Sequence, residues 1–203
     1  MLKLFPLLMM MAMGCGKSLP IEIYIDETFS AIDRKLIFEA IDEWNLEAKQ
    51  RLYDEKPIFV VAGEIETLSS VDDLADKRKV IYNADYKIFT PPHRQTGDAY
   101  GYTTADDALI YINNIRSDYD WTILPEDEND LDRTEKIKRI KKMANYAVKK
   151  VMLHELGHLL ELSHYFHRPG VMNVGIPPNP DLENGPHLSL ADLDAFCTIY
   201  DCK

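Results

Sequence analysis

His154 and His158 lie four residues apart, and Glu155 directly follows the first histidine. Side chains at this spacing lie one above the other on a helix, so both imidazoles can bind one metal ion. Glu155 would lie beside that ion and could accept a proton without being a ligand. An ordinary core is the other interpretation, but burying two imidazoles and a carboxylate without a metal costs much free energy. The spacing therefore favours a zinc site on a helix, with His154 and His158 as ligands and Glu155 as general base.

A catalytic zinc ion needs a third protein ligand and keeps one position open for water. If the helix continued through His164, this residue would lie about 15 Å along the axis from His154, at about 1.5 Å per residue. The chain must therefore leave the helix soon after His158 and fold back if His164 is to bind the same ion. Alternative third ligands stay open at this point, namely Glu183, His167, His187 and Asp192.

The pattern resembles that of the metzincin clan of zinc endopeptidases, which is matched position by position at His154, Glu155, His158 and His164. A short loop later, residues 170–173 (Gly-Val-Met-Asn) are similar to the Met-turn of that clan. By this resemblance Met172 forms an apolar floor beneath the metal, whereas an isolated methionine is more often an ordinary core residue. Residues 187–200 are similar to the final helix of the matrixin branch. Glu161 departs from the family, which has glycine there; a turn at Glu161 would hold it at positive φ at a cost of about 1 kcal/mol.

The resemblance implies an α+β fold of the α/β-like metzincin type, with a mixed twisted sheet, an active-site helix, a Met-turn and a C-terminal helix. It also implies a zinc-dependent endopeptidase that hydrolyses peptide bonds through a metal-activated water, with Glu155 as general base. The substrate would be a protein or peptide, whose extended backbone would pair with the strand expected at residues 108–113. The loop at residues 174–186 would wall the pocket beyond the scissile bond.

Several elements must position these residues. Residues 21–26 alternate apolar and polar side chains, which is typical of a half-buried strand, and further strands are expected at 57–62, 80–82 and 108–113. Ser30 can cap a helix whose apolar residues lie on one face: Ile32, Leu36, Ile37, Ala40, Ile41 and Trp44. Asp132 and Glu135 have capping-box spacing at the start of a long helix. In that helix one stripe leads to the histidines through Ile140, Ala144, Ala147 and Val151, which predicts that its N-terminal part packs on the sheet.

The N-terminus has the composition of an export signal. A lysine, an apolar stretch of about ten residues and small residues before Cys15 predict a lipoprotein-type signal peptide at residues 1–14. Cys15 would then carry the lipid, and residues 15–203 would form the catalytic domain. The protein is expected at a bacterial-type cell envelope, on its periplasmic or outer face, anchored to the membrane by this lipid. A plain signal peptide or an uncleaved anchor remains the alternative.

The other two cysteines, Cys197 and Cys202, form an even pair that can become a disulfide in an oxidising compartment; two free thiols are the alternative. The formal net charge of -11 argues against nucleic acid as a partner, because phosphate contacts need clustered Lys and Arg. A monomer is expected. Calcium is a further cofactor that no motif supports; the acidic residues that could bind it are Asp98, Asp106 and Asp107.

Two other functions remain open. One is a non-catalytic lipoprotein that uses a relic zinc-peptidase fold to bind a surface. Glu155 argues against it, since metal binding alone does not require that carboxylate. The other is a hydrolase of cell-wall peptide crosslinks.

Overall fold

The computed structural model describes residues 18–65, 79–84, 101–103, 109–113, 132–166, 168–173 and 185–202. The predicted signal peptide and Cys15 lie outside these residues. The described elements are, in chain order, β1 (Ile21–Asp26), α1 (Ala31–Leu52), β2 (Phe59–Ile65), β3 (Lys79–Ala84), β4 (Gly101–Thr103), β5 (Leu109–Asn113), α3 (Arg133–Leu159) and α4 (Leu190–Tyr200). Helices and strands share one core, which confirms the general prediction of a mixed α and β protein.

The strands form one mixed sheet in the order β2-β1-β3-β5-β4. Strand β1 pairs in parallel with β2 and β3, β3 pairs in parallel with β5, and β4 runs antiparallel to β5. The alternation predicted for β1 is confirmed, because Ile21, Ile23 and Ile25 are all buried. Successive side chains of a strand point to opposite faces, so these three lie on the same face of the sheet. They belong to the same hydrophobic core as the buried residues of the helices.

Strand β5 does not have the position that the resemblance implied. It lies between β3 and β4, and its residues pair with both neighbours: Ile110, for example, is opposite Ile81 on one side and Thr103 on the other. A substrate backbone cannot add to a strand whose two edges are already paired, so that prediction was wrong. In the described part of the sheet the strand at this edge is β4.

Helix α1 begins as predicted at Ser30, whose side chain accepts the N–H of Asp33 at 3.1 Å. Its buried face includes Trp44, whose indole N–H donates to the main-chain oxygen of Leu153 at 3.0 Å. Ile32 does not belong to this face, since 56% of it is exposed in the first turn of the helix. The Trp44 side chain therefore holds α3 against α1 at Leu153, the residue directly before His154.

Strand β2 starts two residues later than predicted and ends three residues later. Pro57 has no N–H to donate, and the N–H of Ile58 donates to the Asn45 side chain at 3.0 Å, not to a strand. At the other end, Ile65 still pairs with Asp26, the last residue of β1. The end of β2 therefore follows from the length of β1. At its start, Asn45 accepts the N–H groups of both Ile58 and Phe59.

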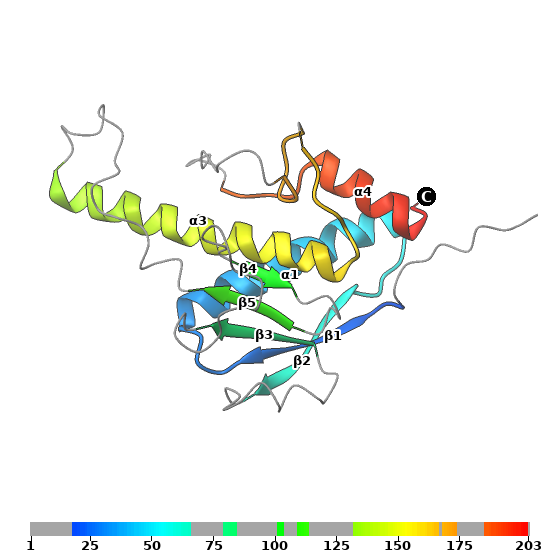
Figure 1. The fold of residues 1–203 in the computed structure, drawn as a ribbon, viewed down its shortest axis with the longest axis horizontal. Coiled ribbons are helices and arrows are strands. Elements are labelled where there is room, and N and C mark those ends of the chain that lie inside the picture. The colour runs from blue at the N-terminus through cyan, green and yellow to red at the C-terminus, as the bar shows by residue number, and fades with distance from the viewer. Residues whose placement is uncertain are drawn as a thin grey trace, which may run out of the picture.

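Helix α3 begins at the predicted cap, because the carboxylate of Asp132 accepts the N–H groups of Thr134 and Glu135 at 2.7 and 2.9 Å. Figure 1 shows the first turns of α3 projecting beyond the sheet and its C-terminal part lying over the strands. Of the stripe predicted to face the core, Ile140 and Ala144 are buried, so burial on this face begins after the first two turns. Among the described residues the fully enclosed side chains are concentrated late in the helix and at its C-cap: Met152, Leu153, Leu156, Leu159 and Leu160.

Helix α4 lies beside α1, and Phe196 of α4 packs against Trp44 of α1 with ring centroids 6.1 Å apart. A disulfide between Cys197 and Cys202 joins the last turns of α4 to the residues that follow it. Among the described residues, no helix has the length and apolar character needed to span a membrane.

Candidate metal centre

Helix α3 ends directly after the second histidine of the motif. The N–H of Glu161 donates to the oxygen of His158 at 2.9 Å, and the N–H of Leu162 donates to that of Gly157 at 3.0 Å. These two bonds form the Schellman arrangement that commonly closes a helix. Glu161 has a φ of 65°, so the turn predicted at this residue is confirmed. Beyond it the chain folds back and brings His164 to the two histidines of the helix.

Replacing Glu161 with glycine should stabilise the protein. Glycine has no Cβ to clash in the left-handed region, so we expect the free energy of unfolding to rise by about 0.5–1 kcal/mol. In a chain of 203 residues this corresponds to a melting temperature higher by about 1–4 °C. Glu161→Ala is the control, because alanine keeps the same backbone penalty. Equal melting temperatures for both variants would show that the left-handed turn holds no strain.

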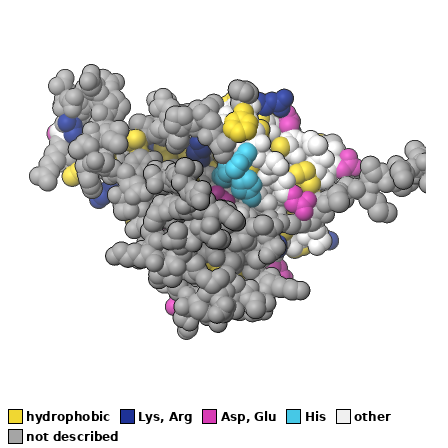
Figure 2. Space-filling view, viewed as in Figure 1, with side chains coloured by type: hydrophobic (Ala, Val, Ile, Leu, Met, Phe, Trp, Pro, Cys, Tyr) yellow, Lys and Arg dark blue, Asp and Glu magenta, His cyan; other side chains and the backbone are white. Residues whose placement is uncertain are grey.

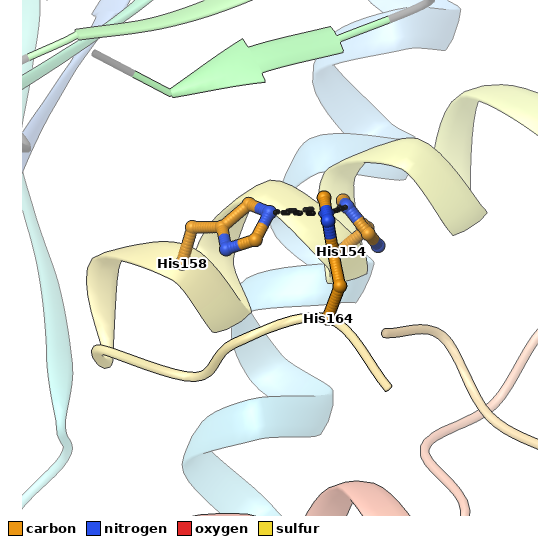
Figure 3. A group of neighbouring side chains, drawn as sticks. All are labelled: His154, His158 and His164. Atoms are coloured by element: carbon orange, nitrogen blue, oxygen red, sulfur yellow. Dashed lines mark hydrogen bonds between the residues drawn. The ribbon is translucent and has the colours of Figure 1, made fainter. Parts of the chain in front are cut away.

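The three histidines converge through their Nε2 atoms (Figure 3). His154 Nε2 lies 3.2 Å from His158 Nε2 and 3.0 Å from His164 Nε2, and the remaining distance, between His158 and His164, is 2.9 Å. An ion bound to three imidazoles at about 2.0–2.1 Å in tetrahedral geometry would set these atoms about 3.4 Å apart. The three distances are therefore within about 0.5 Å of what a tetrahedral metal site requires.

Hydrogen bonds on the far side of two rings decide where their protons lie. The Nδ1 atom of His154 is 2.7 Å from the carbonyl oxygen of Val171, and that of His158 is 2.9 Å from the carbonyl oxygen of Leu162. A carbonyl oxygen only accepts, so each Nδ1 carries the hydrogen and each Nε2 presents a lone pair to the centre. Lone pairs facing each other at 3.2 Å repel unless a cation or a proton lies between them. The donor set thus fits a metal ion that prefers imidazole nitrogen, such as Zn²⁺.

Burial favours the neutral form of His154 and His164. It lowers the pKa of His154 to about 4, an effect that the hydrogen bond to Val171 opposes and the neighbouring His158, His164 and Lys150 reinforce. Burial also lowers the pKa of His164, with a further contribution from His158. A metal ligand must be deprotonated, so at neutral pH His154 can bind without first losing a proton.

Glu155 lies beside this centre on the same helix and is almost fully enclosed, with 4% of it exposed. Its Oε2 accepts a hydrogen bond from the hydroxyl of Thr103, on β4, at 2.6 Å. Burial raises the pKa of the Glu155 carboxyl to about 7, and the bond from Thr103 partly opposes the rise. A nearby cation would favour the carboxylate. A carboxyl group that titrates near neutral pH is suited to accept and return a proton.

Met172 lies beneath the motif and is completely buried. Its sulfur lies directly against Gly157, the residue before His158: a Cβ at position 157 would be 2.5 Å from Met172 Sδ. Sequence reasoning assigned no role to Gly157. A glycine inside a helix costs about 0.5–1 kcal/mol, which was a signal that another part of the chain approaches closely there.

A buried carboxylate holds in place the turn at residues 170–173, the segment predicted to be the Met-turn. Asp192, at the start of α4, accepts the N–H of Met172 at 3.1 Å and the hydroxyl of Tyr165 at 2.7 Å through Oδ1. Its Oδ2 accepts the N–H groups of Val171 at 3.1 Å and Ser189 at 2.7 Å. Burial, then the bond to Asp192, raises the pKa of the Tyr165 hydroxyl, so Tyr165 remains a donor at neutral pH. Asp192 therefore ties the residue after His164, the Met-turn and α4 together.

Glycine at position 170 makes this network possible. Gly170 has a φ of 156°, and a Cβ there would overlap the Tyr165 hydroxyl and lie 2.7 Å from Asp192 Oδ2. No side chain fits at this position unless the network moves.

The alternative third ligands fall into two groups. His187 and Asp192 belong to the described residues, and both have other partners. His187 Nδ1 lies 3.3 Å from Glu43 Oε2, and Asp192 accepts the N–H of Met172. Among the described residues, the group that could hold a metal consists of His154, His158 and His164. The remaining candidates, Glu183 and His167, lie outside those residues, as do the acidic residues considered for calcium, Asp98, Asp106 and Asp107.

Figure 2 shows histidine side chains gathered at the molecular surface, with hydrophobic side chains close by. The centre is thus accessible from outside, although Glu155 itself is nearly enclosed. In comparisons with known proteins, no family model matches the chain and no curated protein matches it.

Proposed function

We propose that this protein is a zinc-dependent endopeptidase. The observation that carries the proposal is the convergence of three imidazole Nε2 atoms within 2.9–3.2 Å of one another, with the buried Glu155 carboxyl next to them in the chain. A metal site alone would need only the histidines. The additional carboxyl, with a pKa near 7, supports a hydrolytic function over simple metal storage.

The histidines and Glu155 have separate roles in the proposed reaction. His154, His158 and His164 would hold the ion through Nε2, and the carbonyl oxygens of Val171 and Leu162 keep two of the rings oriented. Bound zinc would polarise the scissile carbonyl and activate a water for attack. Glu155 accepts the proton of that water and delivers it to the leaving amine, so that the C–N bond breaks and a new carboxylate and amine are released.

Membership of the metzincin clan is part of the proposal. It is supported by the return of the chain at Glu161, which meets the requirement for His164 to join the site. The burial of Met172 beneath the motif and the final helix that begins after Ser189 agree with the same resemblance.

An extended peptide backbone would bind along β4 in this proposal. Strand β4 lies at the edge of the described sheet, and Thr103, its last residue, contacts Glu155. Addition of a peptide to an exposed strand is a common mode of recognition, because main-chain hydrogen bonds do not depend on the peptide sequence. The edge position therefore supports a protein or peptide substrate.

Export to the cell envelope also remains a proposal. The disulfide between Cys197 and Cys202 is of the kind that persists in oxidising compartments. Lipid attachment at Cys15 can be checked by mass spectrometry of protein extracted from membranes.

The proposed activity can be tested on the full chain with an unfolded protein as substrate. We expect cleavage that a zinc chelator abolishes and that added Zn²⁺ restores. Cleavage that is insensitive to the chelator would overturn the proposal. Purified cell-wall sacculi serve as a second substrate: peptide release from sacculi without cleavage of the unfolded protein would assign the hydrolase to wall crosslinks.

The third ligand can be tested by metal content. His164→Ala should lower zinc affinity by at least about 100-fold, because the ion loses one of three protein ligands. His187→Ala is the matched control, since His187 is paired with Glu43 and should leave zinc binding unchanged. Bound zinc is measured by elemental analysis after dialysis against buffered Zn²⁺. Loss of zinc in His187→Ala with retention in His164→Ala would reject this ligand set.

A further inference from the structure

Thr103 is the one described side chain that hydrogen-bonds the Glu155 carboxyl. Its hydroxyl lies 2.6 Å from Glu155 Oε2 and 3.4 Å from the main-chain oxygen of the same residue. A hydroxyl has a single hydrogen, and a carboxylate oxygen at 2.6 Å is the stronger acceptor. The donor is therefore committed to Oε2.

This bond fixes the plane of the carboxylate. With one oxygen held by Thr103, rotation about the last side-chain torsion of Glu155 is restricted, although such a torsion is broad when free. Among the described residues, Glu155 Oε1 has no hydrogen-bond partner. The two oxygens are thus distinguished, and Oε1 is the one left to exchange a proton with a reactant.

The location of Thr103 adds a connection to substrate binding. Thr103 belongs to β4, whose pairing with β5 ends opposite Ile110. A peptide that adds to β4 would therefore bind to the same strand whose Thr103 hydroxyl holds the Glu155 carboxylate.

We infer that Thr103 is a positioning residue, whose hydroxyl orients the Glu155 carboxylate and links it to the strand on which the peptide binds. The inference rests on the proposed function and adds a residue outside the zinc-binding motif. It assigns to the hydroxyl an effect on the rate of the chemical step and not on metal binding.

The chain offers a matched control. Thr28 also donates its hydroxyl to a buried carboxylate, Asp26 Oδ1, at 2.8 Å, and its main-chain N–H bonds the same oxygen at 2.9 Å. Asp26 is the last residue of β1 and Thr28 lies just beyond it, where Asn83 of β3 also hydrogen-bonds both side chains. Substituting Thr28 with Val removes the same type of bond from a place where it can only affect stability.

Thr103→Val, Thr103→Ser and Thr28→Val should be compared as zinc-loaded full chains. We expect Thr103→Val to lower kcat about 10- to 100-fold with little change in KM or bound zinc, because a misplaced base slows only the chemical step. Thr103→Ser keeps the hydroxyl and should restore most of the rate. Thr28→Val should unfold more easily but keep the wild-type kcat.

A second measurement does not depend on activity. The carboxyl carbon resonance of Glu155, assigned by its absence in Glu155→Gln, should shift in Thr103→Val and stay in place in Thr28→Val. An unshifted resonance, or a wild-type kcat in Thr103→Val, would overturn the inference. If the wild-type protein cleaves no peptide, the proposed function fails, while the resonance still decides whether Thr103 holds Glu155.

Discussion

Glu155→Gln should lower kcat by about 100- to 10,000-fold while the protein keeps its zinc. Glutamine has nearly the same shape as glutamate and can still accept the Thr103 hydroxyl, but its amide cannot take a proton from an attacking water. The three imidazoles are untouched, so bound zinc should remain at the wild-type level. Initial rates on a peptide substrate and elemental analysis of the same sample measure both quantities.

Glu161→Gln is the control for this substitution, because Glu161 is an exposed glutamate in the turn after the helix. Its activity should equal that of the wild type. If Glu155→Gln kept more than about a tenth of the wild-type rate, Glu155 could not be the general base.

The same variant should change how the stability of the metal-free protein depends on pH. Burial raises the folded-state pKa of Glu155 from 4.5 to about 7, so the carboxyl stabilises the fold only while it is protonated. This contribution is complete below pH 4.5 and is lost as the pH rises through about 7. Glu155→Gln has no such loss and should exceed the metal-free wild type at pH 8 by on the order of 3 kcal/mol. Denaturant unfolding at pH 8 and pH 4 tests this, and equal differences at both values would contradict it.

Asp192→Asn should destabilise the protein by about 3–5 kcal/mol and reduce its zinc affinity. The carboxylate receives main-chain N–H groups on both oxygens, including those of Met172 and Val171. An asparagine has one acceptor oxygen, and its NH2 group would face other donors at a completely buried position. The Met-turn would lose its support, and with it the carbonyl oxygen of Val171 that orients His154.

The matched control is Asp194→Asn, an exposed aspartate two residues later on the same helix. This substitution should alter the unfolding free energy by less than about 0.5 kcal/mol. Denaturant unfolding and zinc titration of both variants provide the comparison. Equal stabilities of Asp192→Asn and the wild type would show that the Met-turn does not depend on this carboxylate.

Features set by neighbouring residues could be predicted from the sequence. The caps at Ser30 and Asp132 are contacts between a side chain and N–H groups two or three residues away, so the local pattern suffices to identify them. The facing of His154 and His158 follows from helix periodicity alone. The positive φ of Glu161 could be anticipated because helices very commonly end at a residue in the left-handed conformation, which reverses the chain.

Tertiary structure decided the rest, because it depends on residues that are far apart in the chain. Which strand forms the sheet edge follows from the pairing of β5 on both sides, which the alternation of its residues does not indicate. The role of Gly157 depends on the sulfur of Met172, and the support of the Met-turn depends on Asp192.

The amino-acid sequence by itself determined two histidines on one helical face, the carboxyl between them and the elements that carry them, since these are matters of local spacing. The convergence of His164, the orientation of His154 by the carbonyl oxygen of Val171 and the bond from Thr103 to Glu155 were decided only by packing. The physical reason is that each of these contacts joins segments brought together by burial of a common core, whose geometry no local pattern encodes.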